Sequence, residues 1–98
     1  MINVLALFPN TIDPEVLDEL ISKMIPAFKQ GQGLCSLKIS DGHVMSPGGP
    51  PPYSKVIEAS FESLEDFMAW AQTPAAQADK KFMIESGIIR LYYEVNEL

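Results

Sequence analysis

The chain has 98 residues, of which 47% are hydrophobic, and a formal net charge of −6. A chain of this length can bury one core, so we expect a single domain spanning residues 1–98. Its 7 Lys and Arg residues are scattered, which excludes the clustered positive charge that nucleic acids and anionic membranes require. No apolar run reaches the roughly 20 residues of a membrane helix, and the first residues lack the features of a signal peptide. The lone Cys35 excludes an internal disulfide and favours a reducing, cytoplasmic setting.

The first two predicted elements are a strand and a helix. Residues 2–8 form a short run in which both alternating sets are apolar, as in a central strand covered on both faces. Asp13 precedes Pro14, which is the pattern of an N-cap followed by a proline in the first helical turn. An apolar stripe at helical spacing then continues to Phe28. Pro26 interrupts this stripe, so we expect the last turn of the helix to be kinked or tightened.

Two segments of alternating polarity follow the helix, at residues 34–40 and 54–61. Their more apolar sets, which we assign to the core, are Cys35, Leu37 and Ile39 followed by Ile57, Ala59 and Phe61. The opposite sets are more polar and include Lys38 and Glu58. The connection between the segments contains His43 and several prolines, which exclude a central strand and favour an extended, exposed loop.

The last third of the chain predicts two helices and a strand. Ser63 begins the first helix with the spacing of a capping box. Thr73 and the proline after it begin a further helix that runs to about Ser86 and ends at Gly87. Residues 88–95 form the final strand. We assign one of its alternating sets to the core and the other to the opposite face, namely Ile89, Leu91, Tyr93 and Val95 against Ile88, Arg90, Tyr92 and Glu94.

The element order β-α-β-β-α-β predicts an α+β fold of the ferredoxin-like type, with a four-stranded antiparallel sheet and helices on one face. The other face would carry a mixture of charged, aromatic and aliphatic side chains, among them Lys38, Glu58, Arg90 and Tyr92. A second copy packed sheet to sheet would cover this surface, which predicts a homodimer. An ordinary half-polar face in contact with solvent is the alternative that the pattern leaves open.

The sequence resembles the EthD-like family of the dimeric α/β-barrel superfamily over nearly its whole length. The resemblance rests on SKMIPAF at 22–28, GLCSLKIS at 33–40, and PPYSKVIEASFESLEDFMAW with TPAAQADKKF within 51–82. It implies a homodimer whose two sheets form a barrel, with small-molecule pockets between sheet and helices. It also implies a role in the degradation of small organic compounds, or cofactor-independent chemistry as an oxidoreductase, dehydratase or cyclase.

One position departs from the family pattern. The first helix of the family commonly carries a histidine two residues before the proline, and Met24 stands there in this chain. An imidazole can accept or donate a proton near neutral pH, whereas a thioether cannot. The substitution therefore favours the alternative of a non-catalytic ligand-binding or accessory protein.

The residues do not single out a catalytic group. His43 lies in a loop without a partner motif and is expected to be a bystander. The candidate ligand-binding residues would line a cleft between helices and sheet or face a ligand from the sheet, and they are Met24, Tyr53, Trp70, Phe82, Arg90 and Tyr92. Arg90 or Tyr92 would donate a hydrogen bond to a ligand carbonyl or phenolate. The structural alternative is an ion pair between Glu58 and Arg90 on neighbouring strands.

Neither a cofactor nor a metal is expected. The nucleotide-binding patterns GxGxxG and GxxxxGK[ST] do not occur, and the chain has 1 histidine and no carboxylate pair at ligand spacing. The sequence thus predicts a small homodimer that binds a compact apolar or aromatic organic molecule. It acts either as a cofactor-independent oxidoreductase or as a binding protein without turnover.

Overall fold

The computed structural model describes residues 1–78 and 80–98. Its strands and helices, in chain order, are β1 (Ile2–Pro9), α1 (Pro14–Lys29), β2 (Leu34–Ile39), β3 (Tyr53–Phe61), α2 (Leu64–Ala71), α3 (Pro74–Gln77), α4 (Lys80–Glu85) and β4 (Ile89–Glu94). This order confirms the predicted β-α-β-β-α-β arrangement, with the second helical region divided into short helices.

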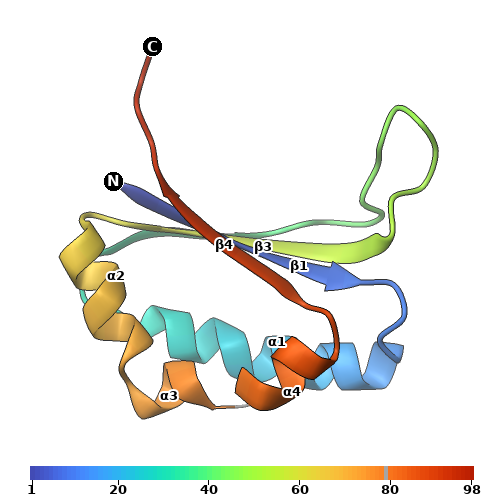
Figure 1. Cartoon of the computed structure of the whole chain (residues 1–98), viewed down its shortest axis with the longest axis horizontal. Helices are drawn as coiled ribbons and strands as arrows, with labels where there is room; N and C mark the ends of the chain where they lie inside the picture. Colours follow the sequence, from blue (N-terminus) through green and yellow to red (C-terminus); the bar gives the residue numbers. More distant parts are fainter. Residues whose placement is uncertain (79) are drawn as a thin grey trace.

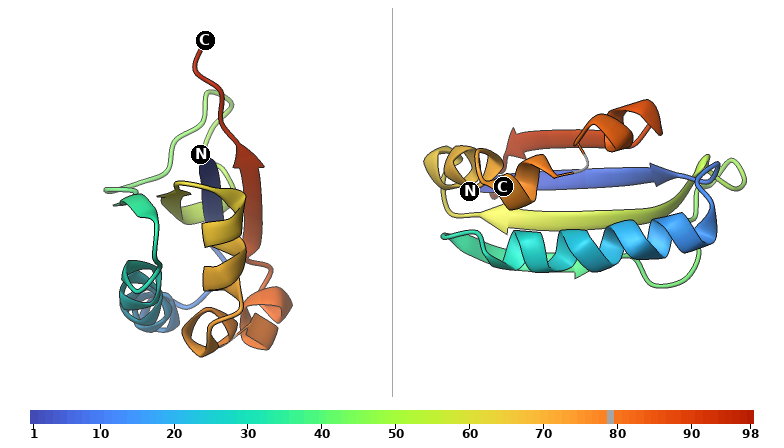
Figure 2. Two further views of the ribbon diagram at one scale, coloured as in Figure 1. Left: turned by 90° about the vertical axis from the view of Figure 1, so that its left-hand side faces the viewer. Right: turned by 90° about the horizontal axis from the view of Figure 1, so that it is seen from below.

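The strands form one antiparallel sheet of 4 strands in the order β2-β3-β1-β4. The helices lie on one face of this sheet, and no described helix covers the other face (Figures 1 and 2). The sheet is open, with β2 and β4 as its edges. The predicted ferredoxin-like α+β fold is therefore confirmed.

β1 takes a central place in the sheet because its run is apolar at every position except Asn3. The side chains that point to the helices are no more than 3% exposed, and they are Ile2, Val4, Ala6 and Phe8. Leu5 and Leu7 point to the other face and are half-buried. β1 therefore contributes apolar surface to both sides of the sheet.

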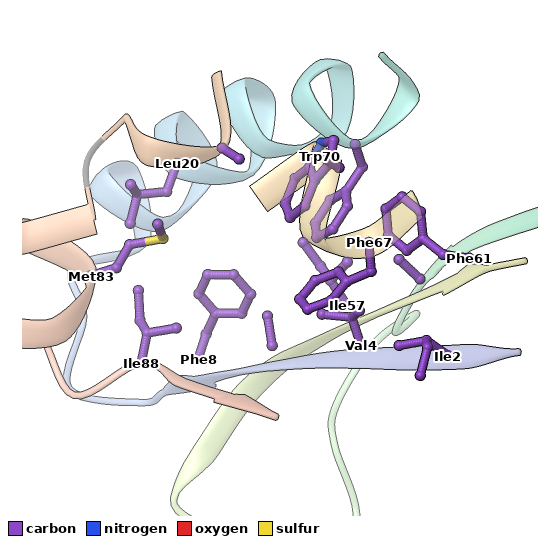
Figure 3. Packing of buried hydrophobic residues seen from close by; sticks show 14 of the residues in the cluster. Ile2, Val4, Phe8, Leu20, Ile57, Phe61, Phe67, Trp70, Met83 and Ile88 are labelled. Carbon is purple, nitrogen blue, oxygen red and sulfur yellow. The ribbon is translucent and has the colours of Figure 1, made fainter. Parts of the chain in front are cut away.

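Aromatic rings fill the core at one end of the sheet (Figure 3). Trp70 of α2 stacks on Phe28 of α1, with the ring centroids 4.5 Å apart. The same indole lies 5.7 Å from the ring of Phe61 and 6.2 Å from that of Phe67. Its N–H donates a hydrogen bond of 2.8 Å to the carbonyl oxygen of Ala27. Trp70 thereby joins α1, α2 and β3.

Hydrogen bonds confirm the predicted helix starts. The carboxylate of Asp13 and the hydroxyls of Ser63 and Thr73 each accept a backbone N–H from the following first turn, at 2.9, 3.1 and 3.2 Å respectively. Such caps satisfy donors that have no partner within the helix. α1 continues through Pro26 to Lys29, so the proline does not end it. Over residues 1–78 and 80–98, no helix combines the length and the apolar character needed to cross a membrane.

The single helix predicted from Thr73 to Ser86 is wrong. α3 ends at Gln77, and the backbone of the cap residue Ala78 is extended with φ −60° and ψ 139°, angles that cannot continue a helix. α4 then begins at Lys80. The part of the prediction that falls on Asp79 lies outside the described residues.

The two faces of β4 are the reverse of the prediction. Arg90 lies opposite Ala6, and Tyr92 lies opposite Val4, in the pairing of β4 with β1. Because cross-strand partners share a face, Arg90 and Tyr92 point to the helices. The residues that were assigned to the core lie on the open face instead, at 38–48% exposure, and they are Ile89, Leu91, Tyr93 and Val95.

The start of β4 explains this reversal. Gly87 ends α4 with a positive φ of 79°, and the N–H of Ile88 then donates a hydrogen bond of 3.1 Å to the carbonyl oxygen of Met83. Ile88 is held beneath α4 at 8% exposure and points into the core beside Phe8 (Figure 3). Since side chains alternate along a strand, the position of Ile88 fixes the face of every residue that follows.

Cys35 is exposed, so its assignment to the core is wrong. The pairing of β2 with β3 shifts between Leu34 and Ser36, which removes Cys35 from the regular alternation. Leu37 and Ile39 keep their predicted face, opposite residues of β3 that are fully buried.

The open face of the sheet carries Lys38 and Glu58, as predicted, and an apolar patch where Arg90 and Tyr92 were expected. We define the open-face patch as Leu5, Leu7, Val56, Ile89, Leu91 and Tyr93, which adjoin one another in the strand register. Asn3 lies beside the patch, where its side chain donates to Glu58 at 3.4 Å and accepts from the hydroxyl of Ser60 at 2.8 Å. The predicted pair of Glu58 with Arg90 is wrong, because β1 separates their strands and the two residues lie on opposite faces.

Candidate functional site

A partly open cavity of about 220 Å³ lies between the sheet and the helices, and we call it the inner cavity. Its apolar walls are formed by Leu20, Met24 and Phe28 of α1, Trp70 of α2 and Met83 of α4. Such walls favour a compact apolar body, and the few polar groups that reach the cavity decide its orientation.

Small residues create this space where α1 and α3 approach each other. Ala75 and Ala76 of α3, the cap residue Ala78 and Ala27 of α1 all line the inner cavity. Protein interiors are close-packed, so larger side chains at these positions would fill the volume. The cavity is thus a consequence of composition in the TPAAQA segment.

Arg90 is the residue of the sheet that lines the inner cavity. Its cross-strand neighbour is Ala6, whose short side chain leaves room for the guanidinium above the sheet. Burial lowers the pKa of Arg90 below its ordinary value, because the charge loses contact with water. With the described residues, the Arg90 guanidinium forms neither an ion pair nor a side-chain hydrogen bond.

A second cavity of about 420 Å³ adjoins the first at the β4 edge of the sheet, and we call it the outer cavity. The two cavities share Ala76, Met83 and Arg90 in their walls. Tyr92 lines the outer cavity, and its ring centroid lies 4.8 Å from that of Phe67. Arg90 therefore stands between two spaces lined mainly by apolar side chains.

The structure brings some of the predicted ligand-binding residues together and separates others. Met24, Trp70 and Arg90 line the inner cavity, and Tyr92 lines the outer one. Tyr53 lies apart from them, in a third cavity of about 400 Å³ beside the loop that joins β2 and β3. Phe82 is 41% exposed on α4 and lines none of these three cavities.

His43 lines the third cavity together with prolines of the loop, and its side chain is exposed. The hydroxyl of Ser54 in the same wall is buried without a hydrogen-bond partner in the described structure. Among residues 1–78 and 80–98, no group of three or more His, Cys, Asp or Glu side chains is placed to hold a metal ion. No carboxylate of the described residues lines the third cavity beside His43 to orient its ring for proton transfer.

We expect His43→Ala to change the free energy of unfolding by less than about 0.5 kcal/mol, as exposed substitutions usually do. Urea denaturation of the variant and the parent protein measures this difference. A loss above about 1 kcal/mol would contradict the prediction, because it would assign a structural role to the histidine.

Sequence analysis missed the lysines and the small residues of the site. Lys23 lines the inner cavity and Lys80 lines the outer cavity. Charged residues on a helix ordinarily predict a solvated face, which is why neither lysine was a candidate. The alanines of TPAAQA were the available signal, because a helix of small residues leaves space against its neighbours.

The fold and the cavities define a ferredoxin-like α+β protein with a pocket between its helices and one face of its sheet. No family model matches the sequence, and no curated protein matches it. Solved structures do match, and at the identities below they establish the fold.

The matching structures include an EthD family protein from Bacillus halodurans C-125. EthD is the family that the sequence resembles. It is 21% identical with a TM-score of 0.76, and the match covers 98% of this chain and 99% of that one. A dimeric ferredoxin-like protein of unknown function from Jannaschia sp. CCS1 is 15% identical with a TM-score of 0.76, over 96% and 98% of the two chains. SnoaB, a cofactor-independent oxygenase from Streptomyces nogalater, is 10% identical with a TM-score of 0.73, over 99% and 94%.

Proposed function

We propose that this protein is an EthD-like homodimer that binds a compact aromatic or alicyclic molecule in the inner cavity. The observation that carries the proposal is the cavity itself, in which Trp70 and Phe28 form flat apolar walls and Arg90 supplies a polar contact. Small-molecule sites generally combine apolar walls with a few convergent polar groups.

The volume of the inner cavity limits the ligand. At about 220 Å³ it is smaller than the roughly 300–1,000 Å³ of typical drug-binding pockets, so a molecule with a single ring suits it better than a polycyclic one. The outer cavity adjoins it through Ala76, Met83 and Arg90, which gives room for a substituent on the ring.

Trp70 provides a direct test, because it is the only tryptophan of the chain and lines the inner cavity. We expect its fluorescence to change on titration with a library of small aromatic and alicyclic molecules. A ligand present at a hundredfold excess over its dissociation constant should stabilise the fold by about 2.7 kcal/mol. Thermal unfolding measures that stabilisation independently of fluorescence.

Ala76→Leu is the matched variant for this test, since a leucine on the shared wall would occupy the cavities. Binding should be weakened in this variant and retained in Val16→Leu, a substitution on an exposed position of α1. A library that produces no change in fluorescence and no thermal shift would refute the binding proposal.

The open-face patch supports the homodimer. Ile89, Leu91 and Tyr93 are 38%, 48% and 45% exposed, and monomeric proteins seldom leave large contiguous apolar patches in water. The loop between β2 and β3 and the segment after β4 both project on the side of the sheet away from the helices (Figure 1). A second copy packed there would cover the patch and close the two sheets into a barrel.

Turnover is the second candidate, and it is favoured by the shared fold with a cofactor-independent oxygenase. Met24 weighs against it, because the inner cavity then has a thioether where the family pattern places an imidazole. Oxygen consumption and product formation with phenolic and quinone-like compounds separate an oxidoreductase from a protein that only binds them.

A further inference from the structure

We propose that the ligand of the inner cavity is a compact aromatic or alicyclic monocarboxylate whose carboxylate binds the guanidinium of Arg90. This inference rests on the proposed binding function and specifies the chemical class of the ligand.

The distribution of charge around the cavities is the first argument. The chain has 13 acidic and 7 basic residues, yet the described charged residues that line the inner and outer cavities are Lys23, Lys80 and Arg90. No carboxylate of the described residues lines either cavity. Within residues 1–78 and 80–98, this acidic protein thus presents only cations to these spaces, which favours a ligand of the opposite charge.

The second argument concerns Arg90 alone. Its guanidinium is half-buried and has no counter-ion among the described residues, while Glu58 lies on the other face of the sheet and accepts a hydrogen bond from Asn3. A buried charge without a partner destabilises a fold, so such groups are usually paired or neutralised. A bound carboxylate would supply the missing partner.

The shape and the single charge of the guanidinium favour a carboxylate as the anion. A guanidinium donates two parallel N–H groups, which match the two oxygens of a carboxylate. Lys23 lies on α1 with its ammonium 3.6 Å from Glu19, and its side chain is 56% exposed, so water and that carboxylate already surround its charge. One unpaired guanidinium balances a single negative charge, which favours a monoanion over a phosphate dianion.

The apolar walls of the two cavities favour an apolar ring as the rest of the ligand. Met83 and Ala76 line both cavities together with Arg90, and Trp70 and Met24 line the inner cavity. If the carboxylate of the ligand binds Arg90 on β4, the ring of the ligand is directed toward these apolar walls. The ligand class that satisfies both requirements is a ring bearing one carboxylate.

The test compares matched acids and amides by calorimetry and by Trp70 fluorescence. The probes are benzoate against benzamide, and cyclohexanecarboxylate against cyclohexanecarboxamide. We expect the parent protein to bind each acid about 10- to 100-fold more tightly than its amide. This ratio of dissociation constants corresponds to the usual free energy of a hydrogen bond to a charged group. Arg90→Met should abolish this preference, and Arg90→Lys should keep a part of it.

Lys38→Met is the matched control, because it removes an exposed cation from the opposite face of the sheet and should leave the preference unchanged. Thermal unfolding verifies that each variant is folded, and Arg90→Gln replaces Arg90→Met if the latter is not. Equal binding of acids and amides would overturn this inference and leave the binding function intact. Preference for acids that survives in both Arg90→Met and Arg90→Gln would overturn the assignment to Arg90. Failure of every probe, acid or amide, to bind would instead refute the binding function.

Discussion

Replacing Trp70 by alanine is expected to lower the free energy of unfolding by about 3–5 kcal/mol, the usual cost of removing a buried large aromatic ring. The indole is 5% exposed, stacks on Phe28 at 4.5 Å and donates a hydrogen bond of 2.8 Å to Ala27. Its removal would leave a cavity between α1, α2 and β3, and the carbonyl of Ala27 would keep only the hydrogen bond that it accepts from the N–H of Gln30 at 3.3 Å. Small domains are stable by only about 5–15 kcal/mol, so the variant would lose a large part of its stability.

Urea denaturation followed by circular dichroism measures this loss, since the variant has no tryptophan fluorescence. Trp70→Phe keeps a ring and removes the indole N–H, so it should cost only about 1–3 kcal/mol. Phe82→Ala is the control for loss of an aromatic side chain at an exposed position, where the change should stay within about 0.5 kcal/mol. Equal losses in Trp70→Ala and Phe82→Ala would contradict the role given to Trp70.

Introducing a lysine into the open-face patch is expected to convert the proposed dimer to a monomer. Ile89 is 38% exposed and lies opposite Leu7 within the patch. In a symmetric dimer each substitution occurs twice, and burying a lysine without a partner is strongly unfavourable. With about 2 kcal/mol lost per copy, the dissociation constant of Ile89→Lys should rise roughly 1,000-fold.

Light scattering at micromolar concentration measures the mass of the parent and variant proteins. Val16→Lys is the matched control, because Val16 is 36% exposed on α1, on the side of the sheet away from the patch. This control should remain dimeric. A parent protein that is monomeric at micromolar concentration would refute the dimer, and a dimer that persists in Ile89→Lys would place the interface elsewhere.

The helix starts and the central strand could be predicted because their signals are local. Asp13, Ser63 and Thr73 cap the helices that they were expected to cap, through hydrogen bonds to residues two or three positions ahead. The apolar residues on both sides of the segment 2–8 are typical of a central strand, and β1 does lie in the middle of the sheet. Such features depend on neighbours in the sequence, so the sequence is sufficient to identify them.

The candidate site was predicted only in part. Met24 and Trp70 were predicted as ligand-binding residues and do line the inner cavity. Lys23 and the alanines that line the same cavity were not predicted. Arg90 was selected for its chemistry but assigned to the wrong face of the sheet. A cavity is a volume that side chains leave empty, and it depends on how closely α1 and α3 approach, which no local pattern specifies.

The sequence by itself determined the ferredoxin-like order of elements, the helix caps, the central place of β1 and the buried face of β3. Only the tertiary structure decided the face of β4, because both of its alternating sets contain aliphatic and aromatic residues and periodicity cannot choose between them. The hydrogen bond from the N–H of Ile88 to the carbonyl oxygen of Met83 holds Ile88 on the helix side and so sets the face of the residues after it. As a result Arg90 points to the cavities, and Ile89, Leu91 and Tyr93 form the open-face patch.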